Sequence, residues 1–226
     1  MTLLEERPFV VIIAGPNGSG KSTLTKTLMA AGVDFGEYIN PDDIAATLDG
    51  GYDARVRKAQ KIADDRREAC VRERRNFTFE TVMSHPSKLE LLRAAYGAGF
   101  LVQMYFIAID DPLINVSRVA NRVAKGGHDV PPEKIVDRYS RVLDLLPTAL
   151  LICDAATVFD NSRTAIQPWL TWSSADLDVR LVTHQIIKFQ RSPNWITDLR
   201  ERILKNRALS LGDQNMTDRL LAVDIR

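Results

Sequence analysis

The sequence is poor in the residues that build metal and disulfide sites. Its 226 residues include two cysteines, Cys70 and Cys153, and three histidines, with no CxxC spacing and no close histidine pair. A zinc site or a disulfide framework is therefore not expected. Both cysteines are predicted to be small buried apolar residues in a reducing compartment.

Long apolar runs and a surplus of one charge are also missing. No stretch reaches the about 18 apolar residues of a transmembrane helix, and residues 1–7 lack the basic start and apolar run of a signal peptide. We therefore expect a cytoplasmic protein without a membrane partner. The formal net charge of +1 makes nucleic acid an unlikely partner, because dedicated nucleic-acid binders carry a strong basic surplus.

What the chain does contain is a phosphate-binding pattern. Residues 15–23 fit G-x-x-x-x-G-K-[ST], directly after the apolar run 9–14 and before a helix-like segment. Glycines let such a loop wrap phosphates with its backbone N–H groups, and the next helix turns its positive N-terminal end to the same anion. The predicted nucleotide-binding residues of the loop are Gly15, Asn17, Gly18, Ser19, Gly20, Lys21, Ser22 and Thr23.

The loop predicts ATP and Mg²⁺ as cofactors. Lys21 is expected to reach the β and γ phosphates, Ser22 to offer its hydroxyl to Mg²⁺, and Thr23 to hydrogen-bond behind it at the helix start. ATP is preferred over GTP because no Asn/Thr-Lys-x-Asp guanine motif is found. A second acidic motif can be read in residues 107–110, although Asp110 fits equally as the cap of the next helix.

Strands and helices alternate between residues 8 and 160. Strands are predicted at 9–14, 38–39, 76–82, 100–109 and 156–160, and helices from 41, over 53–75 and 87–97, from 112 and over 133–146. This alternation predicts an α/β fold, a P-loop NTPase three-layer sandwich with a central mostly parallel sheet, helices on both faces and a lid.

The predicted domain division places a P-loop kinase core in residues 1–162, with its lid at about 118–141. Residues 163–226 form a C-terminal extension of unassigned structure, with a candidate strand at 179–183 and a helix around 195–205. Trp169 and Trp172 lie near a polar turn, and residues 209–226 are expected to be loosely ordered.

Two carboxylates at strand ends are candidates for chemistry. Asp42 follows a strand that we expect beside the loop's own strand, so it could act as the general base on a substrate hydroxyl. Asp42 and Asp43 also fit a purely local role at a helix start. Glu80 and Thr81 end the third strand and are expected to contact the acceptor or water on Mg²⁺; a solvent-exposed strand end is the alternative for Glu80.

Four arginines flank a Gly-Gly turn at residues 126–127. Arg118 and Arg122 share one face of the helix before it, and Arg138 and Arg141 share one face of the helix after it. This is the layout of a lid whose arginines neutralise charge on transferring phosphate oxygens. We predict Arg118 as a nucleotide-binding residue and the other three as catalytic, while the sequence leaves open which of them touch phosphate.

These segments together resemble the zeta-toxin family of P-loop kinases, in particular its compact bacterial members described as predicted ABC-type ATPases. The matching residues are 15–23, 39–42, 79–82, 118–131, 138–141 and 160–162. The resemblance implies an ATP-dependent kinase of a small-molecule hydroxyl, whose best-known relatives phosphorylate UDP-N-acetylglucosamine. It implies Lys21 at the phosphates, Asp42 as base, Glu80 toward the substrate, and Arg122 with Arg138 or Arg141 over the phosphates.

Two other functions stay open at this point. One is a nucleotide-dependent regulatory NTPase whose lid and C-terminal extension contact a protein. The other is a polynucleotide kinase that uses the charged helix 53–75 as a basic surface. An antitoxin or other protein partner is not readable from the sequence.

Overall fold

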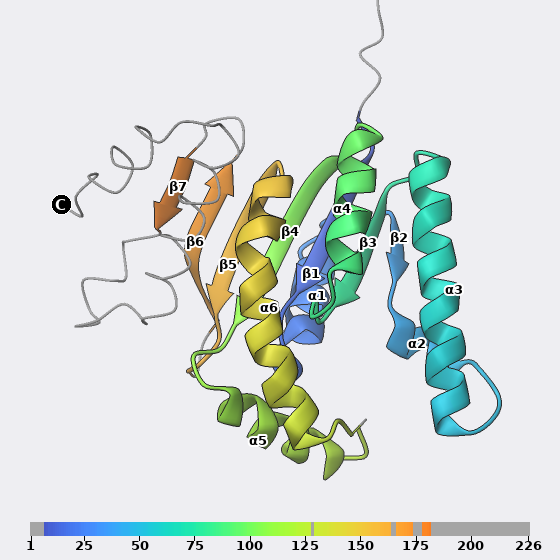
Figure 1. Ribbon diagram of the computed structural model, residues 1–226, viewed down its shortest axis with the longest axis vertical. Coiled ribbons are helices and arrows are strands. Elements are labelled where there is room, and N and C mark those ends of the chain that lie inside the picture. The colour runs from blue at the N-terminus through green and yellow to red at the C-terminus, as the bar shows by residue number, and fades with distance from the viewer. Residues whose placement is uncertain (1–6, 128, 164–165, 174–177, 182–226) are drawn as a thin grey trace, which may run out of the picture.

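The computed structural model describes residues 7–127, 129–163, 166–173 and 178–181 (Figure 1). The predicted helix around 195–205 and the expected loose order at 209–226 lie outside these residues. None of the described helices has both the length and the hydropathy needed to cross a membrane.

Five parallel strands form the centre of the sheet. β1 (Phe9–Ala14) lies between β3 (Phe77–Thr81) and β4 (Leu101–Ala108), while β2 (Glu37–Ile39) pairs with β3 and β5 (Ala155–Asp160) pairs with β4. The predicted α/β fold is confirmed, but β2 is separated from β1 by β3, so the expectation that these two strands are neighbours is wrong. The loop after β1 therefore lies at the middle of the carboxyl edge, where open α/β sheets bind ligands.

Two antiparallel strands extend this sheet beyond β5. β6 (Gln167–Ser173) pairs with β5, and β7 (Asp178–Leu181) pairs with β6 (Figure 1). β7 overlaps the candidate strand at 179–183. β6 was missed, because its tryptophans were interpreted as lying near a turn. The sheet thus continues past residue 162 into the C-terminal extension, which was predicted to pack on the core or to trail it.

Helices cover both faces of the sheet (Figure 1). Along β1, Val10, Ile12 and Ala14 belong to one large core, whereas Val11 and Ile13 belong to a second cluster on the opposite face. This double burial explains the continuous apolar run of the strand. The large core includes residues of α3, α4 and α6, and the second includes Leu28 of α1. The helices are α1 (Lys21–Ala30), α2 (Pro41–Ala46), α3 (Tyr52–Arg72), α4 (Ser87–Gly97), α5 (Pro112–Val123) and α6 (Pro132–Ile152).

Helix starts follow the capping signals in the sequence. Asn40 caps α2 as predicted, because its side-chain oxygen accepts a hydrogen bond from the Asp42 backbone N–H at 3.0 Å. Asp111 caps α5 by accepting from the Leu113 N–H at 2.8 Å, so the interpretation of Asp110 as the cap is wrong.

The end of α6 differs from its prediction. The helix continues through Pro147 to Ile152 instead of ending at residue 146. A proline inside a helix removes one backbone hydrogen bond. Here the residues around it, Leu146, Ala149 and Leu150, are fully buried in the large core. Tertiary packing therefore outweighs the local cost.

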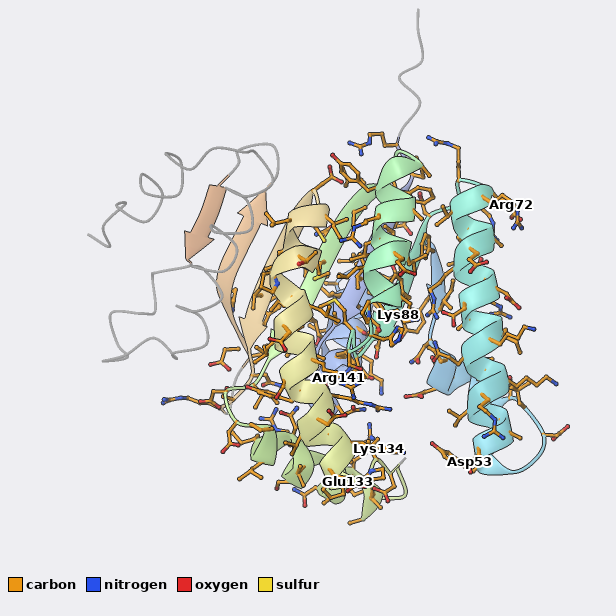
Figure 2. All side chains as sticks on the ribbon, in the orientation of Figure 1. Asp53, Arg72, Lys88, Glu133, Lys134 and Arg141 are labelled. Carbon is orange, nitrogen blue, oxygen red and sulfur yellow. The ribbon has the colours of Figure 1, made fainter. Side chains whose placement is uncertain are left out.

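The long charged helix α3 has one buried face. Ala59, Ala63 and Cys70 are fully buried there, and so is the guanidinium of Arg67, which lies 5.2 Å from the Phe79 ring centroid. Asp64 pairs with this arginine at 2.5 Å, and Lys88 of α4 (Figure 2) pairs with the same carboxylate at 3.1 Å. The rest of the helix is mostly solvated, as predicted. Cys70 and Cys153 are free and buried, as expected.

Candidate active site

The phosphate-binding loop depends on its glycines for close approaches. Gly15 has φ +147°, and a Cβ atom there would lie 2.3 Å from the Ile107 carbonyl oxygen. Gly20 has φ +103°, and a Cβ there would lie 2.7 Å from Nδ2 of Asn161. A side chain at Gly15 would clash with the backbone of β4, and one at Gly20 would displace the Asn161 side chain; both positions also have the positive φ that favours glycine.

Two asparagines from distant parts of the chain hold the loop. Asn115, in α5, donates its Nδ2 hydrogen to the Asn17 carbonyl oxygen at 2.5 Å. Asn161, directly after β5, donates to the Ser19 carbonyl oxygen at 2.8 Å. Neither was assigned a role from the sequence. The position of Asn161 at the carboxyl end of a parallel strand is the signal that could have identified it.

Lys21 lies across its own loop. Its Nζ atom donates to the carbonyl oxygens of Gly15 at 2.9 Å and Pro16 at 3.0 Å. Burial lowers the pKa of Lys21 to about 8, opposed by the negative charges of Glu80 and Asp42 and reinforced by the positive charge of Arg122. These charges are thus close enough to act on one ammonium group.

Glu80 is the carboxylate beside the loop helix. Its Oε1 atom accepts from the Thr25 hydroxyl at 2.5 Å and the Tyr38 hydroxyl at 2.8 Å, and its Oε2 atom accepts from the Ser22 hydroxyl at 3.1 Å. With 8% of its surface exposed, Glu80 is not the solvent-exposed strand end of the alternative interpretation. It is brought to Ser22 because β3 lies directly beside β1.

Two other predicted residues at strand ends have local roles. The Thr81 carbonyl accepts from the Gly15 N–H at 3.3 Å, and its hydroxyl accepts from the Met83 N–H at 3.0 Å. Asp110 is exposed after β4, where its backbone N–H donates to the Ser162 hydroxyl at 2.9 Å. The carboxylate that contacts Ser22 is therefore Glu80 and not Asp110, contrary to the second acidic motif.

Asp42 and Asp43 lie in the first turn of α2. Asp42 is exposed, and its charge acts on Lys21. The pKa of Asp43 is raised by burial, then by the charges of Glu80 and Asp42, against a hydrogen bond from Asn40. The two carboxylates therefore stabilise the start of α2 through the helix dipole. The negative charge of Asp42 also acts on Lys21 of the loop.

The four predicted lid arginines have three different surroundings: the loop, the surface of α6 and a hollow beside α5. Arg138 donates from Nη1 to the Asn17 side-chain oxygen at 3.4 Å, so α6 reaches the loop. Arg141 projects from the middle of α6 (Figure 2) and forms an ion pair with Asp137 on the surface. Arg118 and Arg122 line a hollow of about 360 Å³ whose other lining residues are Asn121, Lys125 and Gly127.

The turn after α5 packs tightly on Arg122. A Cβ atom at Gly127 would lie 2.5 Å from the Arg122 Cγ atom, and the Gly127 N–H donates to the Arg122 carbonyl at 2.9 Å. Gly127 therefore supports the arginine side chain on which the predicted lid depends.

The residues present fit a nucleotide-bound Mg²⁺. No group of three or more histidine, cysteine, aspartate or glutamate side chains within the described ranges could hold a metal by itself. Magnesium in nucleotide sites needs fewer protein ligands, because phosphate oxygens and water complete its octahedron. The Ser22 hydroxyl and the Glu80 Oε2 atom, 3.1 Å apart, offer oxygens of the required kind.

Fold and site define a P-loop nucleotide-binding protein with a kinase-like α/β domain. A family model described as an AAA domain matches residues 10–146, more than half of the chain, and the chain belongs to this family. The resemblance seen in the sequence to P-loop kinases is thus confirmed at the level of family and fold.

Three similar proteins illustrate the relationship. An uncharacterized Haemophilus influenzae protein is 27% identical over 139 residues, which are 57% of this chain and 91% of that protein. The structure from the PezAT chromosomal toxin-antitoxin system of Streptococcus pneumoniae has a TM-score of 0.53 at 16% identity, covering 96% of this chain and 89% of its own. The complex of AvrRxo1-ORF1 and ORF2 with ATP has a TM-score of 0.61 at 15% identity, covering 96% and 80%.

Proposed function

We propose that the protein is an ATP-dependent phosphotransferase that moves the γ-phosphate to the hydroxyl of a small molecule. The observation that carries this proposal is that a phosphate-binding lysine, a pair of oxygen ligands suited to a metal and a carboxylate lie at one edge of the sheet. The loop lysine, the Ser22–Glu80 pair and the Asp42 carboxylate all act on the same small region. Phosphoryl transfer needs such a cradle, a metal site and a carboxylate for the attacking hydroxyl.

The loop and Lys21 would bind the donor. Backbone N–H groups of the loop after Pro16, which itself has none, would hold the β and γ phosphates, and Lys21 would exchange its two carbonyl partners for phosphate oxygens. Ser22 and Glu80 would hold Mg²⁺, which would supply positive charge to compensate the phosphate oxygens. Arg122 and Arg138 approach from the lid side and compensate charge on the transferring group.

Asp42 would act on the acceptor. Its carboxylate accepts the proton of the substrate hydroxyl while that oxygen bonds to the γ-phosphorus and ADP leaves. Asp42 is exposed in the first turn of α2, so a substrate hydroxyl could approach its carboxylate. A UDP-N-acetyl sugar is the first acceptor to test, because the resemblance to zeta toxins suggests it.

The test is Mg²⁺-dependent ADP release with a panel of hydroxyl compounds that includes UDP-sugars and nucleosides. We expect one class of acceptor to raise ADP release well above the rate with water. A purely regulatory nucleotide switch predicts ATP binding without stimulation by any acceptor, and this result would overturn the proposal. An oligonucleotide in the panel tests the polynucleotide kinase alternative, whose binding would weaken steeply with salt.

A further inference from the structure

The Glu80 carboxylate receives unequal hydrogen bonding on its two oxygens. Two hydroxyl groups, from Thr25 of α1 and Tyr38 of β2, donate to Oε1 at 2.5 and 2.8 Å. Oε2 accepts from the Ser22 hydroxyl at 3.1 Å. The carboxylate is therefore anchored through one oxygen and presents the other to the metal-binding side of the loop.

The two hydrogen bonds to Oε1 restrict the orientation of the Glu80 carboxylate. The terminal torsion of a glutamate is broad, so an isolated carboxylate rotates freely between orientations. Two donors on Oε1, both on residues packed in the fold, select a single orientation. Thr25 is almost fully buried in α1, and its hydroxyl also lies 3.1 Å from the Lys21 carbonyl oxygen.

Tyr38 remains a donor over the physiological pH range. A tyrosine phenol ordinarily has a pKa of about 10, and the Tyr38 hydroxyl lies 2.8 Å from the Glu80 Oε1 atom. The phenol thus keeps its proton, and its O–H points to the carboxylate. A charged acceptor makes this hydrogen bond stronger than one between neutral groups.

The same phenol is linked to the helix that carries the proposed base. Asn40 donates its Nδ2 hydrogen to the Tyr38 oxygen at 3.2 Å, and its Oδ1 atom accepts from the Asp42 N–H at 3.0 Å. Ser22, Glu80, Tyr38, Asn40 and the backbone of Asp42 therefore form one continuous chain of hydrogen bonds. This chain joins the metal side of the site to its acceptor side.

We propose that Tyr38 and Thr25 are positioning residues that hold the Glu80 Oε2 atom toward Ser22 and thereby set the affinity of the loop for magnesium-bound nucleotide. The inference rests on the proposed binding of nucleotide at this loop. It adds two residues to the site that no motif assigns, and it gives them a role that acts through Glu80.

The test measures binding of a fluorescent non-hydrolysable ATP analogue, so it needs no acceptor and no turnover. The analogue is titrated with Mg²⁺ on the wild type, Tyr38→Phe, Thr25→Val and Thr25→Ser. Tyr105→Phe is the matched control, because this half-buried tyrosine of β4 instead accepts from Gln103 at 2.7 Å. Circular dichroism and thermal melting verify that each variant is folded.

We expect Tyr38→Phe and Thr25→Val to raise the half-saturating Mg²⁺ concentration about tenfold, as loss of a hydrogen bond to a charged group implies. Thr25→Ser keeps the hydroxyl and should stay within about twofold of the wild type, as should Tyr105→Phe. Binding of the analogue in EDTA should be unchanged in all variants, because the effect acts only through the metal.

Other results would overturn the inference. An unchanged Mg²⁺ requirement in both Tyr38→Phe and Thr25→Val would show that Glu80 is positioned without them. Equal weakening with and without Mg²⁺ would show that the two residues serve only packing of the loop. Wild-type protein that binds no analogue at all would overturn the proposed function itself, and this outcome is distinct from a wild type that binds while its variants behave identically.

Discussion

The two sides of the phosphate-binding loop are built in different ways. On the β2–β3 side, Glu80 is fixed by three hydroxyl donors, and the helix of Asp42 is capped by Asn40. On the α5–α6 side, Asn115 holds the loop backbone through the Asn17 carbonyl oxygen at 2.5 Å, and the arginine Arg138 donates to the Asn17 side-chain oxygen at the longer distance of 3.4 Å.

This difference matches the chemistry expected of each side. Carboxylates that orient a metal and a hydroxyl must be placed accurately before the substrate arrives. Arginines that compensate phosphate charge reach their final geometry when the anion is bound and the lid closes. The carboxylate of Glu80 is thus oriented before a ligand binds, whereas the arginines of α5 and α6 are proposed to reach their final positions when the nucleotide is bound. Five experiments test this comparison and its consequences.

The largest effect is expected where both sides meet, at Lys21. Lys21→Ala removes the cation on which the charges of Glu80, Asp42 and Arg122 all act, and it should lower the rate of phosphoryl transfer by at least about 1,000-fold. Steady-state kinetics of ADP release measures this change. Lys26→Ala, an exposed lysine of α1, is the control and should retain activity.

Asp42→Asn tests the acidic side. It keeps the size of the side chain and the cap of α2 but removes the proton acceptor, so kcat should fall by about 100- to 10,000-fold. Affinity for the ATP analogue should be retained. Asp49→Asn, an exposed aspartate outside the site, is the matched control. Undiminished transfer by Asp42→Asn would show that another group acts as the base.

The basic side is tested by comparing two arginines of one helix. Arg138→Ala should lower kcat about tenfold or more, because Arg138 already reaches the loop. Arg141→Ala should have a smaller effect, since its guanidinium is paired with Asp137 on the surface. The ratio of the two kcat values is the measurement. A larger loss for Arg141→Ala would mean that lid closure brings a different face of α6 to the phosphates.

The smallest effect concerns pH. Because the pKa of Lys21 is lowered to about 8 by burial, raising the pH through this value discharges the ammonium group and should weaken analogue binding. Lys21→Arg keeps its charge at any accessible pH, so its binding should not change over this range. A wild-type dissociation constant that stays flat through about pH 8 would contradict the lowered pKa.

The same shift has a consequence for stability in the absence of nucleotide. The folded pKa lies below the ordinary value of 10.5, so the unfolded chain binds more protons between about 8 and 10.5. The contribution of Lys21 to the free energy of unfolding therefore rises with pH across this window. Chemical denaturation of the wild type and Lys21→Met should differ in this slope.

The sequence by itself determined the alternating strands and helices between residues 8 and 160 and the loop pattern, although not every boundary. The loop pattern at 15–23, the helix cap at Asn40 and the apolar strands at 9–14 and 100–109 are local signals. The structure confirms the cap and both strands. Local patterns of this kind depend on residues within one or two turns of each other. They are therefore readable from the chain alone.

Only the tertiary structure decided which distant groups meet. Because β3 and not β2 lies beside β1, Glu80 reaches Ser22 across 58 positions, while Asp110 does not. Asn115 and Asn161 bond to the loop from 98 and 142 positions away. Strand order and helix packing bring these side chains together. No spacing in the sequence encodes them, because hydrogen bonds between distant segments depend on the whole sheet.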